Sequence, residues 1–250
     1  MPRSEKLGAY LELAGEVRSL ANNLANDLSR RLQADEQAVA FRDRLLIGLA
    51  VKMYNSFECL RNDAEDKRLE AMHHLKTLVE TFIYFRWAAK DTGDSSARLV
   101  YARTINETIH FNKKNPGYAP KAILREWVKQ LATATHGLES RWQKFKDRTI
   151  RQLARDIGID LEKWYNRIYR LACGPAHIGD LMEHMPGPDG EIHLNKTPTS
   201  RLRSEIALDY GLHIMWDLLK IASDYLDLRL KERISMLQTR HNALRSVRIM

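Results

Sequence analysis

The sequence predicts an all-α protein, a single-domain bundle of long helices with one loop or short hairpin near residues 185–200. Three observations predict this fold class. Ala, Leu, Glu, Lys, Arg and Gln, which favour helices, fill the chain. Glycine and proline are scarce before Pro116, and apolar residues recur at helical spacing. The 250 residues, of which 44% are hydrophobic and 29% charged, suffice to bury a core and exclude a mainly disordered chain.

Four helices are expected in the first half of the chain. They cover residues 4–33, 35–61, 64–90 and 96–113. The segment Asp91-Thr92-Gly93-Asp94-Ser95 supplies residues that end the third helix and cap the fourth. Residues 75–89 are apolar on nearly every face, so the third helix is expected to be surrounded by neighbours.

The second half is expected to be helical at 120–136, at 141–157 and again from an N-cap at Asp160. Gly174-Pro175 interrupts that last helix. Residues 185–200 form the loop, with a short strand at 191–194, and one helix fills 200–245. We predict one domain over residues 1–250, with the N-terminal helix (1–35) and the basic C-terminal helix end (229–250) as appendages.

Composition limits the class of protein. The longest apolar run, Leu45 to Val51, is far too short to span a membrane, and residues 1–6 lead into no signal peptide. Two cysteines, Cys59 and Cys173, form neither a disulfide scaffold nor a zinc site, so a cytoplasmic location without a cofactor is expected. The net charge of +8 is modest; it permits an anionic partner such as RNA, but a solvated, slightly cationic surface is the favoured interpretation. A protein partner and a homodimer stay open.

Arginine and histidine recur at spacings that resemble the Arg-x(4–6)-His signature of HEPN ribonucleases, in which the arginine stabilises phosphate charge and the histidine moves protons. The matches are Arg103 with His110, Arg170 with His177, and Arg68 with His73 and His74. With 9 histidines in 250 residues, such matches also arise by chance. Arg170 and His177 are favoured because aromatic side chains surround the arginine and Gly174-Pro175 bends the helix. Arg103 and His110 lie on a polar stripe typical of an exposed helix face.

Glu80 lies within the apolar third helix, where an unpaired carboxylate is costly. We therefore expect Glu80 to be neutral, paired or beside a cavity. Lys76, four residues earlier on the same face, is one candidate partner. A structural pair on a partly wet face and a role in a pocket both stay open.

Two further patterns offer other chemistry. Glu70 with His73 and Glu107 with His110 match the Glu-x-x-His motif of di-iron helical bundles, which gives an alternative iron or manganese site. A basic and aromatic stretch fits single-stranded RNA through stacking and phosphate contacts, while a solvated helix face with core aromatics explains it equally well. That stretch contains Arg141, Trp142, Lys144, Phe145, Lys146, Arg148, Arg151 and Arg155.

Four segments carry a family resemblance: residues Lys76 to Glu80, residues Tyr169 to His177, and the stretches 152–158 and 198–210. They resemble the domain-of-unknown-function 5677 family of uncharacterised bacterial proteins, the first being similar to its Arg-x-Leu-x-Glu segment and the second to its Tyr-Arg-x-x-Ser-x-x-x-His segment. Lys76 replaces the arginine and Cys173 the serine. The resemblance spans roughly residues 39–227; it implies an all-helical fold and mobile or defence-related bacterial contexts, including toxins, but no established activity.

The leading hypothesis places a polar pocket between the third helix and the bent helix. Its candidate binding residues are Lys76 and Tyr169, with Arg103 and His110 as further candidates. If the protein is an enzyme, it is a metal-independent, HEPN-like endoribonuclease. Arg170 then stabilises phosphate charge, His177 acts as base and acid, and Glu80 orients them. The alternatives are a non-catalytic interaction or scaffold module and the di-metal bundle.

Overall fold

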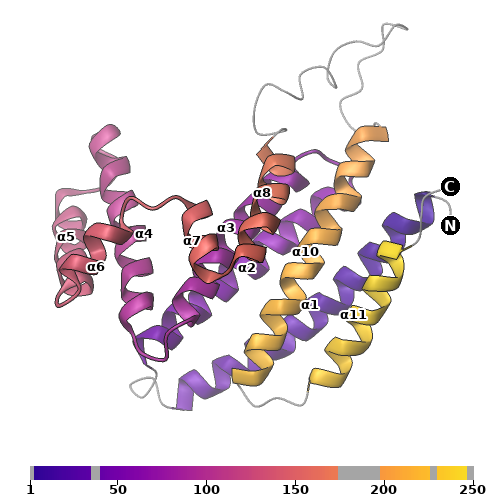
Figure 1. Cartoon of the computed structure of the whole chain (residues 1–250), viewed down its shortest axis with the longest axis horizontal. Helices are drawn as coiled ribbons and strands as arrows, with labels where there is room; N and C mark the ends of the chain where they lie inside the picture. Colours follow the sequence, from indigo (N-terminus) through magenta and orange to yellow (C-terminus); the bar gives the residue numbers. More distant parts are fainter. Residues whose placement is uncertain (1–2, 35–39, 174–197, 226–229, 247–250) are drawn as a thin grey trace, which may run out of the picture. The chain divides into compact units, whose positions relative to one another are not determined.

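A computed structural model describes residues 3–34, 40–173, 198–225 and 230–246, which form helices joined by short turns (Figure 1). No strand occurs among these residues, so the all-α prediction is confirmed. The helices are α1 (Arg3–Ala34), α2 (Phe41–Glu65), α3 (Ala71–Ala89), α4 (Ser95–Lys114), α5 (Lys121–Thr135), α6 (Glu139–Phe145), α7 (Ile150–Ile157), α8 (Ile159–Cys173), α10 (Pro198–Tyr225) and α11 (Lys231–Ser246).

The chain divides into two compact units. Unit 1 comprises Met1–Glu36, Ala50–Phe82 and Trp164–Met250, and unit 2 comprises Gln37–Leu49 and Ile83–Lys163. Helices α2, α3 and α8 contribute residues to both. The prediction of one domain with two appendages stays a prediction.

In unit 1, helices α1, α10 and α11 lie side by side (Figure 1). Apolar side chains hold them together, because Leu13 and Val17 of α1 and Trp216 of α10 are fully buried. Helix α2 approaches α10 at Gly211, where a Cβ atom would lie 3.2 Å from the Leu60 side chain. A larger residue at position 211 would therefore require the Leu60 side chain to shift.

Asp209 is the centre of a polar cluster inside unit 1. Its Oδ1 atom accepts from His241 Nε2 at 2.8 Å and pairs with Arg245 Nε at 3.1 Å. The indole N–H of Trp216 donates to His241 Nδ1 at 3.2 Å, so the imidazole is neutral and carries its proton on Nε2. Burial, reinforced by the Asp209 charge, raises the pKa of Tyr10, whose hydroxyl also faces Asp209. Together these bonds fasten α11 to α10 and α1.

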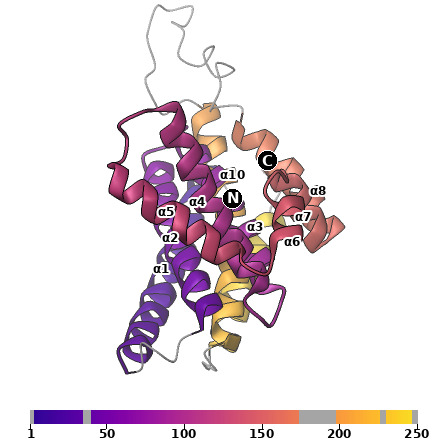
Figure 2. The same ribbon diagram turned by 90° about the vertical axis from the view of Figure 1, so that its left-hand side faces the viewer.

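In unit 2, α4 packs against α5, and the two lie side by side in Figure 2. Arg98 of α4 donates to backbone carbonyls at the C-terminal end of α5, including Ala134 at 3.1 Å and Thr133 at 3.0 Å. Carbonyls in the last turn of a helix lack partners within the helix, so the arginine stabilises that end.

Glu162, at the start of α8, joins α7 to α8 within unit 2. Its buried carboxylate accepts from Arg151 at 2.7 Å and from Arg155 through two bonds of 2.7 Å. These hydrogen bonds, from Arg155 first and Arg151 second, lower the pKa of Glu162 to about 2.

Several predicted helix boundaries are wrong. The second helix extends to Glu65 and the third begins only at Ala71, because the chain reverses at Lys67 with a φ of 57°. That turn contains neither glycine nor proline, so the sequence carried no clear signal for it. Helix α8 begins at Ile159, which places Asp160 in its first turn rather than at its N-cap.

Two predicted continuous helices are each divided. The segment 141–157 separates into α6 and α7 at Thr149, whose hydroxyl accepts from the Gln152 backbone while Gln152 accepts from the Thr149 N–H. The segment 200–245 separates into α10 and α11, because α11 packs back against α10 and α1. The break at Gly174-Pro175 and the strand predicted at 191–194 lie outside the described residues, and so does the predicted loop at 185–200 as far as residue 197. The last residues of that loop, from Pro198 onward, belong to α10 instead. In the described segments, no helix combines the length with the hydropathy that a membrane span requires.

Replacing His241 with alanine is expected to lower the free energy of unfolding by about 2–4 kcal/mol, because it opens a cavity and leaves the Trp216 N–H without its acceptor. Chemical denaturation followed by circular dichroism measures this. Asn242→Ala, at the exposed neighbouring position, serves as the matched control and is expected to change stability by less than about 0.5 kcal/mol. Equal effects of the two substitutions would contradict the role given to His241.

The Glu162 cluster predicts a pH-dependent contribution to stability. Because the folded pKa of about 2 lies below the ordinary glutamate value of 4.5, the contribution is complete above pH 4.5 and is lost as the pH falls towards 2. The difference in unfolding free energy between the wild type and Glu162→Gln should therefore shrink over that interval. Arg155→Gln should move the loss to higher pH. A difference that stays constant down to pH 2.5 would refute this interpretation.

Candidate functional site

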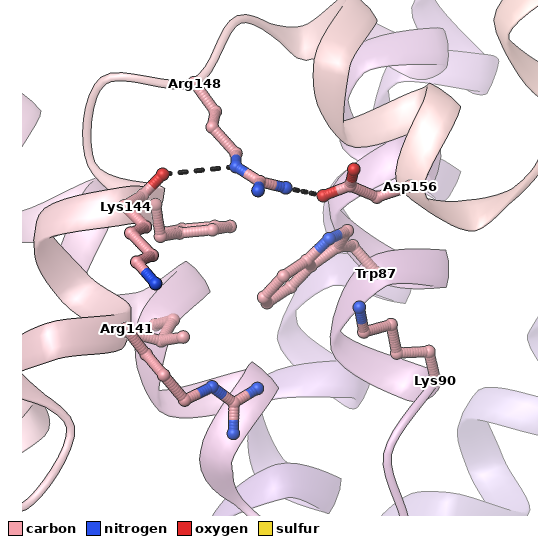
Figure 3. A pocket seen from close by; sticks show the side chains of 8 residues that line it. Trp87, Lys90, Arg141, Lys144, Arg148 and Asp156 are labelled. Carbon is pink, nitrogen blue, oxygen red and sulfur yellow. Dashed lines mark hydrogen bonds and ion pairs between the residues drawn. The ribbon is translucent and has the colours of Figure 1, made fainter.

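Unit 2 contains a pocket of about 230 Å³ between the end of α3, α4, α6 and α7 (Figure 3). Most of its lining is cationic or aromatic. The residues that line it are Trp87, Lys90, Leu99, Arg141, Lys144, Phe145, Arg148 and Asp156.

Four of these side chains are cations, and two carboxylates partly balance them. Arg148 forms an ion pair with Asp156 (Figure 3). Arg141 lies 3.4 Å from Asp91, whose pKa is lowered by the Ser96 hydroxyl first and by Arg141 as well. Lys90 and Lys144 belong to none of the ion pairs found in the described part of the chain. The pocket therefore carries positive charge in excess.

The apolar wall of the pocket is formed by two buried rings. Trp87 and Phe145 are 4% and 2% exposed, and their ring centroids lie 4.4 Å apart. The Lys90 ammonium lies 4.5 Å from the centre of the Trp87 ring, a cation–π contact. Within the described residues, the buried indole Nε1 of Trp87 has no hydrogen-bond partner. In Figure 3 this edge of the indole faces the Arg148–Asp156 pair.

The break between α6 and α7 places Arg148 at the pocket. Its Nε atom donates to the Lys144 carbonyl at 3.1 Å, and its own carbonyl accepts from Arg103 Nη1 at 2.5 Å. The Arg103 guanidinium also lies over the rings of Tyr84 and Phe145 at 5.5 and 6.0 Å. Arg103, a candidate binding residue, is therefore largely buried rather than part of an exposed stripe, and it supports the backbone beside the pocket. Its ion pair with Glu107 is 2.9 Å long.

The sequence identified half of this pocket. The basic stretch contains Arg141, Lys144 and Arg148, but the rings of Trp142 and Phe145 are buried, which confirms the core alternative for them. The other four lining residues, Trp87, Lys90, Leu99 and Asp156, were missed. A tryptophan and a lysine three residues apart at the end of an apolar helix were the available signal.

The structure brings together two residues of the predicted pocket between α3 and α8, both in unit 1. The Lys76 ammonium lies 5.4 Å from the centre of the Tyr169 ring, and the Tyr165 ring, tilted by 34°, lies 4.9 Å from that of Tyr169. Glu80, one turn after Lys76, is half-buried. Arg170 follows Tyr169 on α8 and is exposed. His177 lies outside the described residues.

The predicted metal ligands do not converge within the part of the chain that the structure describes, where no group of three or more His, Cys, Asp or Glu side chains could hold a metal ion. Glu70, His73 and His110 are exposed. Glu107, also exposed, pairs with Arg103 instead. The di-metal alternative therefore has no support among these four residues.

The fold and the pocket define an all-helical protein with a cationic and aromatic site. Residues 43–192 match the family of unknown function DUF5677, so the chain belongs to that family, as the resemblance implied. The matched region contains the pocket of unit 2 and the Lys76, Glu80 and Tyr169 positions. Comparison with curated proteins and with solved structures gave no match.

Proposed function

We propose that this protein binds single-stranded RNA through its backbone phosphates at the pocket of unit 2. The observation that carries the proposal is the convergence of four cations on one pocket with buried aromatic walls. Cationic side chains supply most of the affinity of nucleic-acid-binding proteins, because they replace the counterions condensed on the phosphates.

The burial of the rings defines the kind of binding. Trp87 and Phe145 are too covered to stack on bases, so they supply a low-dielectric wall that strengthens the attraction of the neighbouring cations for phosphate. Recognition is consequently expected to depend on the backbone and to be insensitive to base sequence.

Lys144→Ala is expected to weaken RNA binding and to reduce the slope of log K against log salt by about 0.7, the value for one phosphate contact on a single strand. Fluorescence anisotropy with a labelled mixed-sequence RNA at several salt concentrations measures both quantities. Lys129→Ala is the matched control, because Lys129 is an exposed helical lysine of unit 2 that does not line the pocket. Equal slopes for the two variants would contradict phosphate binding at this site.

A second candidate function is metal-independent RNA cleavage near α3 and α8. It is supported by the contact of Lys76 with Tyr169, which brings the two family segments together in unit 1. In this proposal Arg170 stabilises the developing phosphate charge, His177 serves as base and acid, and Glu80 orients them. The 2′-hydroxyl of the RNA is the nucleophile.

His177→Ala is expected to abolish cleavage of a labelled RNA while leaving the thermal midpoint and RNA binding nearly unchanged. His136→Ala, at an exposed position beyond α5, is the control and should cleave normally. Unaltered cleavage by the His177 variant would exclude the mechanism. A large loss of thermal stability would instead favour the non-catalytic interaction module.

A further inference from the structure

We infer that the pocket of unit 2 takes a phosphate dianion, the terminal phosphomonoester of an RNA strand, in preference to an internal phosphodiester. The inference rests on the proposed RNA-binding function and names the chemical group that the site selects. Three observations carry it: the charge of the pocket, an unsatisfied donor in its wall, and its size.

The first observation is the charge balance. Lys90, Lys144, Arg141 and Arg148 contribute four positive charges, and the carboxylates of Asp91 and Asp156 offset two of them. An internal phosphodiester carries one negative charge, whereas a terminal phosphomonoester carries about 1.5 to 2 near pH 7. The terminal group therefore matches the excess charge of the pocket, and the internal group leaves part of it unbalanced.

The second observation is the Trp87 indole. A buried N–H without an acceptor is unfavourable, and buried polar groups in folded proteins are rarely left so. Trp87 Nε1 is such a group, because the tryptophan is only 4% exposed and its N–H has no acceptor among the described residues. Its nitrogen edge faces the Arg148–Asp156 pair at the pocket (Figure 3). A terminal phosphate presents three acceptor oxygens, enough to meet this N–H together with Lys90 and Lys144.

The third observation is the size of the pocket. The volume of about 230 Å³ lies below the range of about 300–1,000 Å³ that is typical of sites for drug-sized ligands. This holds one phosphate group and part of the attached sugar, but not a run of nucleotides. A strand end enters such a site with its phosphate foremost, whereas an internal phosphate must bring a sugar on each side.

The test compares RNA oligonucleotides of one sequence that carry either a 5′-phosphate or a 5′-hydroxyl, with the fluorophore on an internal base. With the full chain, the phosphorylated strand is expected to bind about tenfold more tightly, the effect of added charge-assisted hydrogen bonds. Trp87→Phe, which removes the N–H and keeps a ring, should lower this ratio. Lys144→Ala should lower it as well and does not disturb the buried wall. Lys129→Ala should keep the full ratio.

The outcomes separate the two proposals. If neither oligonucleotide binds even at low salt, RNA binding itself is wrong. If both bind equally, and Lys144→Ala weakens both equally, RNA binding stands and the terminal-phosphate inference is overturned.

Competition identifies the source of the phosphate. A nucleoside 5′-monophosphate is added to the complex with RNA. If it displaces the RNA only at concentrations far above the dissociation constant of the RNA, the result supports a strand end as the ligand. Displacement at concentrations near that constant would assign the site to a free nucleotide and overturn the RNA part of the inference.

Discussion

The pocket of unit 2 depends on the interruption between α6 and α7. The Thr149 capping box starts α7 at Ile150, so Arg148 falls between two helices instead of on the surface of one. Arg148 then satisfies the Lys144 carbonyl in the last turn of α6 and pairs with Asp156 of α7. One side chain therefore closes a helix end and ties two helices together. The other three cations of the pocket, Lys90, Arg141 and Lys144, lie around the Arg148 side chain.

Two other charged clusters show why the pocket differs from a purely structural network. Asp209 accepts from His241 and pairs with Arg245, and Glu162 is surrounded by two arginines. In both clusters a central carboxylate accepts hydrogen bonds from the surrounding donors, an arrangement that stabilises the fold. The pocket has the opposite balance, with cations and an indole N–H in excess over acceptors among the described residues. Such an excess of donors suits an anionic ligand.

Helix α3 contributes to both candidate sites. Lys76 and Glu80 lie on its part in unit 1, and Trp87 lies on its part in unit 2. The sequence predicted this helix to be buried, and Leu75, Leu78 and Ile83 are fully buried. The sequence of a helix that is apolar on all sides does not indicate which of its polar atoms find hydrogen-bond partners. The indole N–H of Trp87, which has no acceptor among the described residues, could therefore not be predicted. The resemblance to the family, by contrast, could be seen in short motifs.

The sequence by itself determined the all-helical class and the positions of most helices, because helix formation depends on composition, capping and the spacing of apolar residues within one segment. The break at Thr149 was missed, although Thr149 and Gln152 match the spacing of a capping box, which the structure contains. Only the tertiary structure decided the turn-back of α11 onto α10 and the meeting of Trp87 with Lys144 and Arg148. These contacts join residues far apart in the chain, and their geometry depends on how whole helices pack rather than on any local preference.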